Sequence, residues 1–368
     1  MPFKESSLFI LLHCPLAALV AACALSTSVA ACTPTPTPAS ETSAPSKEST
    51  PEVYRRSQPM MGTRFEIQVV SADADRAGRA IDAAFAEIDR VESLISEWRP
   101  TSEISEVNRL GAARPVAVGP ELFEVVRRGL ELSAQTQGAF DITFAACGHL
   151  WSVGDEQIPT DEQIADCLPR IDHSAVTVDE DERTIALGNE HSQLGLGGIG
   201  KGYGVDRAAR VLEARGIEDF VVDGGGDLRV KGRRIDRPWS VGVIHPRAPR
   251  ELLGTVSISE GALVTSGDYE RYFELDGTRY HHIIDPATGR PANRSVAVTV
   301  IAADATRADA LATGLFVMGP REGIALAERL DDVEAMIVDP DLSIHKSSGF
   351  AHFFRPAASP VTPAPGGL

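Results

Sequence analysis

The stretch Arg271-Tyr-Phe-Glu-Leu-Asp-Gly-Thr-Arg-Tyr-His-His-Ile-Ile284 decides the fold class of this chain. Its strand-forming halves, residues 271–275 and 278–284, flank Asp276-Gly277, and an Asp-Gly pair between two such runs is the strongest short-range indication of an antiparallel hairpin. Other strand-forming runs also follow one another directly, with helical patterns between groups of them. This order predicts an α+β fold of mixed or antiparallel sheets with packed helices, rather than a doubly wound parallel sheet.

Periodicity places the remaining elements. A two-residue period predicts a strand over residues 58–70, where Phe65, Ile67 and Val69 alternate with polar side chains. Further strands are expected over residues 175–178, 184–187, 220–222, 239–244, 252–259, 296–302 and 335–338, and helices over 81–95, 120–132, 202–215, 306–316 and 320–330. Residues 54–354 are therefore expected to form one folded unit, followed by a flexible tail over 355–368.

The first 53 residues carry a targeting pattern. Residues 8–25 are almost purely apolar, which is typical of a secretory signal rather than of a membrane span. Val-Ala-Ala-Cys ends at Cys23 and again at Cys32, and both copies resemble the bacterial lipobox, whose cysteine is acylated. An ordinary cleaved signal is the alternative. We favour a signal peptide with a lipobox over residues 1–32, since a Pro/Thr/Ser-rich linker over 33–53 follows Cys32 directly. That predicts an exported lipoprotein, anchored in the membrane and facing the periplasm or the cell exterior.

The charge of the chain excludes one class of partner. It contains 35 Lys and Arg against 52 Asp and Glu, a formal net charge of -17. A field of this sign repels phosphate backbones, so nucleic acid is not an expected partner. To bind an anionic small molecule, the protein would need a local source of positive potential, either a metal ion or a loop of glycine amides.

Two cysteines remain in the folded part, Cys147 and Cys167. Export makes a disulfide possible, but their spacing does not distinguish a disulfide from two buried thiols. No Cys-x-x-Cys or Cys/His zinc pattern occurs.

The densest cluster of small residues is Gly195-Leu-Gly-Gly-Ile-Gly-Lys-Gly-Tyr-Gly204, placed just before an expected helix. Amides at a helix start favour anions. The spacing fits the dinucleotide-binding pattern G-x-G-x-x-G, with Asp223 as the ribose contact. It also fits a Walker A loop, except that Gly202 stands where Ser or Thr should bind magnesium. A tight glycine turn without a ligand is the third possibility.

Two other groups of polar residues could carry chemistry. Asp309 and Thr313 share one helical face, and two hard oxygens at that spacing can ligate Mg²⁺. The alternative is a solvated Asp and a Thr bonded to its own helix carbonyl. His281 and His282 should point to opposite faces of their strand. One of them could act as a general base near Asp285, or both could be structural.

Eight blocks in order along the chain are more specific than any one motif. They are Met60-Met-Gly-Thr63, Ser96-Glu-Trp-Arg-Pro-Thr-Ser-Glu-Ile104, Gly138-Ala-Phe-Asp-Ile-Thr143, Gly197-Gly-Ile-Gly-Lys-Gly-Tyr203, Val222-Asp-Gly-Gly-Gly-Asp227, Thr265-Ser-Gly-Asp-Tyr-Glu270, His282-Ile-Ile-Asp-Pro-Ala-Thr-Gly289 and Ala308-Asp-Ala-Leu-Ala-Thr313. The series closely resembles the ApbE family of FAD:protein FMN transferases, and it spans residues 54–353.

The resemblance implies a T-fold-like catalytic unit and a reaction. Members use Mg²⁺ to split FAD and pass FMN to a threonine of a target protein, releasing AMP. The implied acceptors are extracytoplasmic flavoprotein subunits of respiratory or ion-pumping complexes. An Mg²⁺-dependent FAD pyrophosphatase and a non-catalytic flavin-binding lipoprotein are the alternatives.

The resemblance also assigns residues. It implies FAD contacts at Met61, Trp98, Ala139, Phe140, Asp141, Lys201 and Ile283, and magnesium ligands at Asp309, Thr313 and the carbonyl of Gly198. His282 corresponds to the residue expected to help deprotonate the acceptor threonine. The chain departs from the family at Gly195, where Asp is frequent, at Gly200, where Ala is common, and at Cys147-Gly148, which interrupt a stretch that usually contains Pro.

Overall fold

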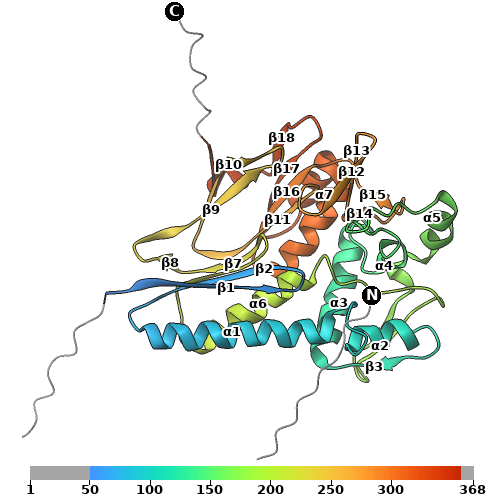
Figure 1. Ribbon diagram of the computed structural model, residues 1–368, viewed down its shortest axis with the longest axis horizontal. Helices are drawn as coiled ribbons and strands as arrows, with labels where there is room; N and C mark the ends of the chain where they lie inside the picture. The colour runs from blue at the N-terminus through green and yellow to red at the C-terminus, as the bar shows by residue number, and fades with distance from the viewer. Residues whose placement is uncertain (1–49, 358–368) are drawn as a thin grey trace, which may run out of the picture. The chain divides into compact units, whose positions relative to one another are not determined.

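An antiparallel sheet of eight strands runs through the domain (Figure 1). The computed structural model describes residues 50–357, so the expected signal peptide, Cys23, Cys32 and nearly all of the linker lie outside the described residues. The strands lie in the order β1 (Glu52–Met60), β2 (Thr63–Ser71), β6 (Phe220–Gly224), β7 (Asp227–Lys231), β11 (Glu260–Gly267), β16 (Ala297–Ala302), β17 (Glu334–Val338) and β18 (Ile344–Lys346). Neighbouring strands pair antiparallel throughout, which confirms the α+β prediction.

Helices cover one face of this sheet and a second sheet covers the other. The helices are α1 (Ala74–Ile95), α2 (Glu103–Leu110), α3 (Pro120–Gln135), α4 (Ala145–Gly148), α5 (Asp161–Cys167), α6 (Gly200–Ala214) and α7 (Ala305–Ala327). Helices α1, α6 and α7 share one apolar core with the sheet. Among residues 50–357, no helix is long and apolar enough to cross a membrane.

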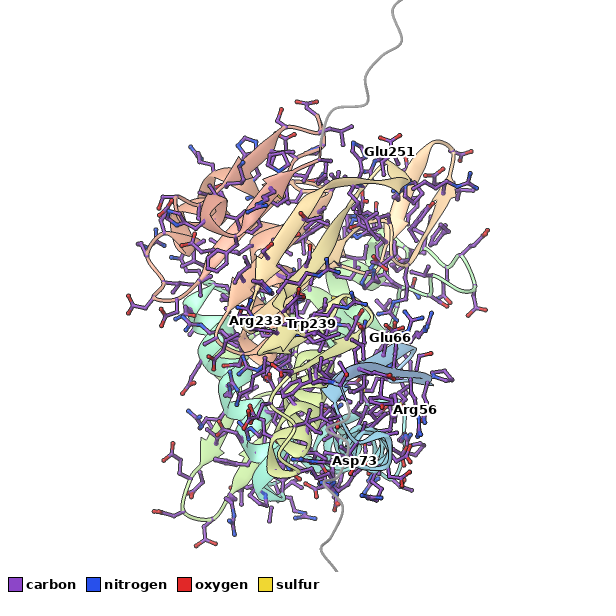
Figure 2. All side chains as sticks on the ribbon, turned by 90° about the vertical axis from the view of Figure 1, so that its left-hand side faces the viewer. Arg56, Glu66, Asp73, Arg233, Trp239 and Glu251 are labelled. Atoms are coloured by element: carbon purple, nitrogen blue, oxygen red, sulfur yellow. A yellow bond between two sulfur atoms is a disulfide. The ribbon has the colours of Figure 1, made fainter. Side chains whose placement is uncertain are left out.

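The second sheet packs on the opposite face. Its strands are β8 (Arg233–Arg234), β9 (Arg237–His245), β10 (Ala248–Ile258) and β19 (Phe354–Pro356). Trp239 of β9 is buried between the two sheets, and its indole Nε1 donates to the Lys231 carbonyl of β7 at 3.1 Å (Figure 2). Smaller sheets join β3 (Val116–Ala117) to β5 (Thr184–Ala186) and β4 (Thr177–Asp179), β12 (Tyr272–Leu275) to β13 (Thr278–His281), and β14 (Ile284–Asp285) to β15 (Arg290–Pro291).

The hairpin predicted at Asp276-Gly277 is confirmed. Strands β12 and β13 pair antiparallel, and both turn residues have positive φ, 50° and 76°. The second strand ends at His281, three residues earlier than expected. His282 therefore lies on the connection to β14 rather than inside the strand.

The single strand expected over residues 58–70 is wrong. The chain turns at Met61-Gly62, with φ of 49° and 71°, and forms the hairpin of β1 and β2. Methionine is not a usual turn residue, so the alternating pattern concealed the reversal. Strand β1 begins at Glu52, and Arg355 and Pro356 belong to β19 rather than to the expected tail. The ordered domain thus extends two residues beyond each predicted boundary.

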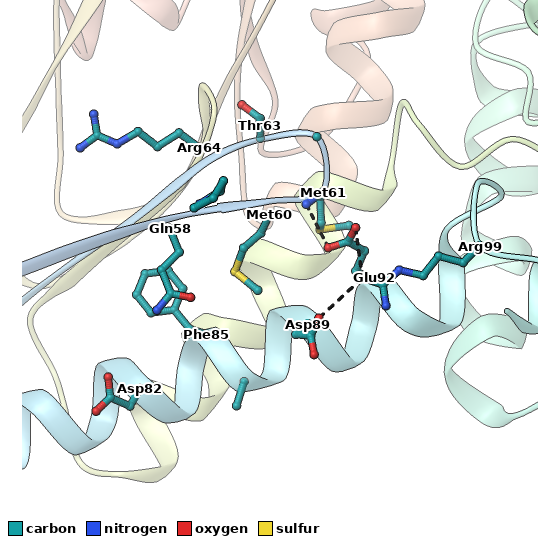
Figure 3. Close-up of a pocket in the computed structure, with 13 residues that line it drawn as sticks. Gln58, Met60, Met61, Thr63, Arg64, Asp82, Phe85, Asp89, Glu92 and Arg99 are labelled. Carbon is teal, nitrogen blue, oxygen red and sulfur yellow. Dashed lines mark hydrogen bonds and ion pairs between the residues drawn. The ribbon is translucent and has the colours of Figure 1, made fainter. Parts of the chain in front are cut away.

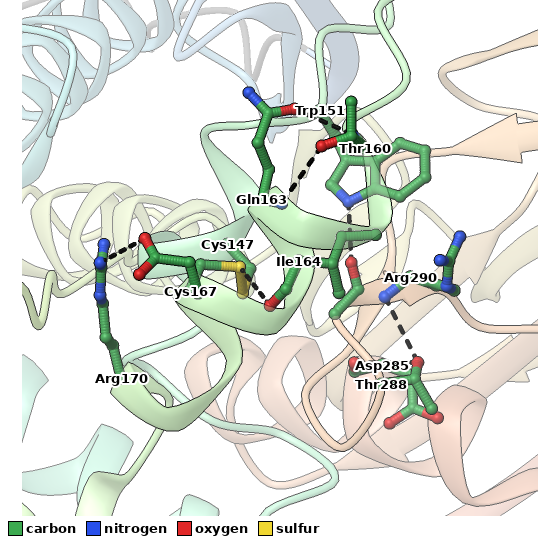
Figure 4. Close-up of a disulfide and its surroundings, with 12 residues drawn as sticks. Cys147, Trp151, Thr160, Gln163, Ile164, Cys167, Arg170, Asp285, Thr288 and Arg290 are labelled. Atoms are coloured by element: carbon green, nitrogen blue, oxygen red, sulfur yellow. Dashed lines mark hydrogen bonds and ion pairs between the residues drawn. A yellow bond between two sulfur atoms is a disulfide. The ribbon is translucent and has the colours of Figure 1, made fainter.

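Cys147 and Cys167 form a disulfide between α4 and α5, with Cα atoms 5.2 Å apart (Figure 4). Gly289, on the turn after β14, lies against it: a Cβ placed there would be 3.5 Å from the Cys147 sulfur. The Gly289 carbonyl accepts a hydrogen bond from Trp151 Nε1 at 2.8 Å. The disulfide therefore supports the turn that follows His282.

Replacing both cysteines with serine is expected to lower the free energy of unfolding by about 2–4 kcal/mol, since the bond closes a loop in the unfolded chain. Urea unfolding followed by circular dichroism measures this. Wild-type protein unfolded with a thiol reductant should show the same loss. An unchanged midpoint in both samples would contradict the prediction.

Candidate functional site

The glycine-rich loop before α6 is fixed by three separate segments. The Asn108 side chain donates to the Leu194 carbonyl at 2.9 Å and accepts from the Leu194 amide at 2.7 Å. The Gly195 amide donates to the Ile142 carbonyl at 2.7 Å. The Glu97 carboxylate accepts from the Leu196 amide at 3.0 Å, and burial raises the pKa of Glu97 above its usual value. The loop is therefore positioned by the protein's own hydrogen bonds.

Two alternative interpretations of this loop are excluded by its surroundings. A dinucleotide fold needs parallel strands, whereas the main sheet is antiparallel and Asp223 accepts from Gly226 N in its own turn. A Walker A loop needs a hydroxyl at position 202, but a Cβ there would lie 2.2 Å from the Ala305 carbonyl oxygen. Gly202 is required because α6 crosses the start of α7 at this point.

Gly195, the first departure from the family pattern, also has a steric reason. A Cβ at this position would lie 2.8 Å from the Phe144 ring and 2.9 Å from the Ala145 methyl group. The aspartate that the resemblance led us to expect here therefore has no room beside α4. The chain supplies no carboxylate to the site from position 195.

The crossing of α6 and α7 creates a buried charge cluster. Lys201 Nζ lies 2.6 Å from Asp227 Oδ2 and 3.2 and 3.3 Å from the two oxygens of Asp309. Gly202 N donates to Asp309 Oδ2 at 3.1 Å. Asp227 and Asp309 are only 2% and 1% exposed, so the solvated Asp309 considered from the sequence is wrong.

The cluster changes the acidity of its members. Burial alone would lower the pKa of the Lys201 ammonium, but the adjacent carboxylates of Asp227 and Asp309 raise it above its ordinary value. Burial and the nearby Asp309 charge raise the pKa of Asp227 well above its usual range, against the opposing effect of Lys201. One ammonium thus faces two buried carboxyl groups.

Thr313 lies one turn beyond Asp309 and faces the glycine loop. A Cβ on Gly198 would be 3.2 Å from both Thr313 Oγ1 and the Phe140 ring. Within residues 50–357 the Thr313 hydroxyl makes no hydrogen bond to its own helix, in contrast to Ser133 of α3 and Thr136 at the C-cap of α3. The three predicted magnesium ligands, Gly198, Asp309 and Thr313, therefore lie close together.

This set fits a hard cation. A carboxylate, a hydroxyl and a backbone carbonyl are oxygen donors of the kind that Mg²⁺ prefers, with water and phosphate oxygens completing its shell. If both acids are ionised, the cluster of Lys201, Asp227 and Asp309 has an excess of one negative charge, which a cation would offset. In the described part of the chain, no group of three or more His, Cys, Asp or Glu side chains could hold a metal.

The two neighbouring histidines have different roles. His281 is buried, and both its nitrogens are used: Nε2 lies 2.8 Å from the Ala292 carbonyl, and Nδ1 accepts from Ile283 N at 3.2 Å. Among the described residues, the His282 ring has a partner only at Nδ1, which lies 3.3 Å from the Arg271 carbonyl; the carbonyl can only accept. His282 is therefore the tautomer with a proton on Nδ1 and a free lone pair on Nε2.

His282 is held neutral. Burial, followed by the positive charge of Arg271 and a smaller effect of Lys201, lowers its pKa to about 3. Asp285, the partner considered from the sequence, instead accepts from Ala287 N in its own turn.

Asp141 has internal partners for both carboxylate oxygens. Oδ1 accepts from the Thr143 amide at 2.8 Å and the Thr143 hydroxyl at 2.6 Å. Oδ2 accepts from the His173 amide at 3.2 Å and lies 2.8 Å from His173 Nδ1. Asp141 thus holds the loop that places Phe140 beside Gly198. Its expected direct contact with adenine or ribose stays a prediction, as do the contacts of Ala139 and Ile283.

Met61 lies at the other end of the site, on the β1–β2 turn. A Cβ on Gly204 would be 3.0 Å from its sulfur, so the thioether packs on α6. Its amide donates to Glu92 at 3.0 Å. Figure 3 shows Met61 at the edge of a cavity of about 910 Å³ between this turn and α1, lined also by Phe85 and Arg99.

Trp98 is 77% exposed, the largest value among the big apolar side chains of the described residues. Its ring centroid lies 5.4 Å from that of His149. The adjacent Glu97 binds the glycine loop, so the exposed indole stands beside it. A flat aromatic surface in that position can stack on a flavin or adenine ring.

Replacing Trp98 with alanine is expected to weaken FAD binding by about 5- to 160-fold, the effect of losing one ring-stacking contact of about 1–3 kcal/mol. Quenching of flavin fluorescence measures the affinity. Trp98→Phe should retain most of it, and neither variant should lower the melting temperature, because the side chain is exposed. If Trp98→Ala bound FAD as tightly as the wild type, Trp98 would not be a contact of FAD.

Three residues of the site were missed as functional from the sequence. Asp227 ends one of the family blocks, but nothing local indicated its pairing with Lys201. Glu97 lies inside one family block and Asn108 lies in none, and neither has a local pattern that indicates its hydrogen bond to the glycine loop. Only Asp227 had a signal in the sequence: its carboxylate directly follows three glycines at the start of a strand.

Known proteins share the sequence and the fold of this chain. The sequence profile of the ApbE family matches residues 61–337. The FAD:protein FMN transferase of Vibrio cholerae serotype O1 is 36% identical over 321 residues, covering 83% of this chain and 94% of that protein. The crystal structure of the ApbE protein from Thermotoga maritima superposes with a TM-score of 0.77 at 31% identity, covering 83% of this chain and all of that one. The flavin transferase ApbE from Vibrio cholerae gives 0.73 at 33% identity, covering 82% and 99%.

Proposed function

The chain belongs to the ApbE family, and we propose that it is an Mg²⁺-dependent transferase that moves FMN from FAD to a threonine of a target protein. The observation that carries the proposal is the convergence of Gly198, Asp309 and Thr313 beside Lys201. That geometry provides hard oxygen donors and one ammonium where a diphosphate must be held.

Each part of FAD has a matching surface. The amides of the fixed glycine loop and the Lys201 ammonium suit the diphosphate oxygens. Trp98 and Met61 offer apolar area for a ring system. Asp309, Thr313 and the Gly198 carbonyl would hold Mg²⁺, which would neutralise phosphate charge and polarise the phosphoryl group. In a chain with a net charge of -17, such local compensation is needed to bind an anion.

The chemistry is a phosphoryl transfer. The threonine oxygen forms a bond to the FMN phosphorus, the bond from that phosphorus to the bridging oxygen breaks, and AMP leaves with the electron pair. The threonine proton passes to the free Nε2 of His282, a neutral imidazole that is able to accept it. Positioning and charge stabilisation account for most of the catalysis in reactions of this type.

We further propose that the protein works outside the cytoplasmic membrane on a lipid anchor. Support comes from the apolar run over residues 8–25, the two lipobox-like cysteines and the disulfide. The acceptors would then be extracytoplasmic flavoprotein subunits of respiratory or ion-pumping complexes. Mass spectrometry of the membrane-extracted protein would show whether its first residue is acylated Cys23 or Cys32.

The transfer assay is direct. Full-length protein, FAD, MgCl₂ and a candidate acceptor are mixed, and a fluorescent acceptor band that survives denaturing electrophoresis is expected. Replacing the acceptor threonine with valine should remove the band. Release of free FMN and AMP without any band would indicate a pyrophosphatase instead. Intact FAD that binds but is never cleaved would indicate a flavin-binding protein.

A further inference from the structure

We propose that Asp227 is a positioning residue for this reaction: it retains the Lys201 ammonium and so leaves the Asp309 carboxylate available to Mg²⁺. The inference rests on the proposed function, because that function assigns Asp309 to the ion. Asp227 itself is assigned no contact with metal or substrate.

The backbone fixes Asp227 in place. It is the first residue of β7, directly after Gly225 and Gly226, whose φ angles of 74° and 98° favour glycine. The Gly226 amide donates to Asp223 Oδ1 at 2.9 Å, and the Gly226 carbonyl accepts from Thr265 N at 3.2 Å. Hydrogen bonds to β6 and β11 thus hold this turn, and the turn directs the buried Asp227 carboxylate at Lys201.

The distances show which acid holds the lysine. Lys201 Nζ is 2.6 Å from Asp227 but at least 3.2 Å from Asp309. In the described residues these two are its only ion-pair partners. A cation bound by Asp309 would repel the ammonium, and Asp227 provides the position in which the ammonium can remain.

Removing the Asp227 charge should therefore weaken the binding of Mg²⁺. With an amide at position 227, Lys201 would have Asp309 as its only acidic partner, and both would be held together in a poorly solvated site. Mg²⁺ would then have to displace the lysine from its ligand. A purely structural Asp227 would instead change stability without changing Mg²⁺ affinity.

The experiment titrates MgCl₂ into the full-length protein by calorimetry. Asp227→Asn is expected to weaken Mg²⁺ binding by about tenfold or more, as for loss of a close buried charge. Asp227→Glu, which retains the charge, should recover most of the affinity. Glu87→Gln is the matched control: it breaks another ion pair, that of Glu87 with Arg90 and Arg207, and should leave Mg²⁺ affinity unchanged.

A double-mutant cycle tests the route of the effect. In a Lys201→Met background no ammonium competes for Asp309, so Asp227→Asn should weaken Mg²⁺ binding at least about threefold less than in the wild type. Asp227→Asn alone leaves the Lys201 ammonium paired with Asp309, so the single variant creates no unpaired buried charge. Equal losses in the two backgrounds would mean that Asp227 acts on the metal itself, which overturns the inference.

The outcomes separate this inference from the proposed function. Unchanged Mg²⁺ affinity in Asp227→Asn, in a protein that transfers FMN, overturns the inference alone. Weakened Mg²⁺ affinity in a protein that transfers no FMN to any acceptor supports the inference and contradicts the proposed function. Melting temperatures recorded for every variant identify changes that arise from stability.

Discussion

Asp309→Asn is expected to lower the rate of FMN transfer by about 10³-fold or more, because a charged ligand of the proposed Mg²⁺ ion would be lost. The amide can still accept the hydrogen bond from Gly202 N, so the crossing of α6 and α7 should survive. Removing Mg²⁺ from the wild type with a chelator should give a loss of the same size. The transfer assay with fluorescent detection measures both.

Asp304 provides the matched control on the same helix. Its carboxylate caps α7 by accepting from Arg307 N at 2.8 Å and pairs with Arg128 at 2.7 Å. Asp304→Asn should cost stability but leave the transfer rate within about threefold, since the residue does not touch the cluster. Transfer that persists in Asp309→Asn, or in the chelated wild type, would contradict a metal-dependent reaction.

His282→Gln is expected to lower kcat for transfer by about 10²- to 10⁴-fold, the usual contribution of a general base, while FAD affinity changes little. Its pKa of about 3 means that the imidazole is neutral and competent down to mildly acidic pH. The pH–rate profile of the wild type should therefore lack a step near the ordinary histidine value of 6.5. A transfer rate unaffected by the substitution would eliminate His282 as the base.

The same pKa predicts how stability depends on pH. Because the folded state disfavours protonation of His282, acid favours the unfolded chain. The contribution of this residue is complete above pH 6.5 and is lost as the pH falls toward 3. Wild-type protein should thus lose stability in acid faster than His282→Gln, measured by urea unfolding at several pH values. Parallel curves would show that the histidine is not buried in its neutral form.

The elements that local patterns determine were predictable. The hairpin at Asp276-Gly277, the amphipathic helices α1 and α3, and the break at Gly319 before Pro320 all have short-range causes. Strand β11 was missed because it is buried in the middle of the sheet and shows no alternation. The turn at Met61-Gly62 was missed because its first residue adopts a left-handed conformation that methionine rarely takes.

The residues of the site also differ in how far the sequence could predict their placement. Asp309 and Thr313 lie four residues apart on one helix, so their shared face follows from the sequence. The pairing of Lys201 with Asp227 depends on where β7 meets α6, 26 residues apart in the chain. No local pattern encodes that distance. The residues alone did not distinguish His281 from His282, and the family resemblance selected His282. Which ring nitrogens are hydrogen-bonded depends on the fold.

The fixed glycine loop has a consequence for the kinetics of substrate capture. Hydrogen bonds with the Asn108 side chain, the Glu97 carboxylate and the Ile142 carbonyl already hold the loop backbone. FAD therefore need not order a flexible segment when it binds. Little conformational entropy should then be lost on association. Binding should follow a single phase that is first order in FAD, and variants of Asn108 should slow association more than they speed release.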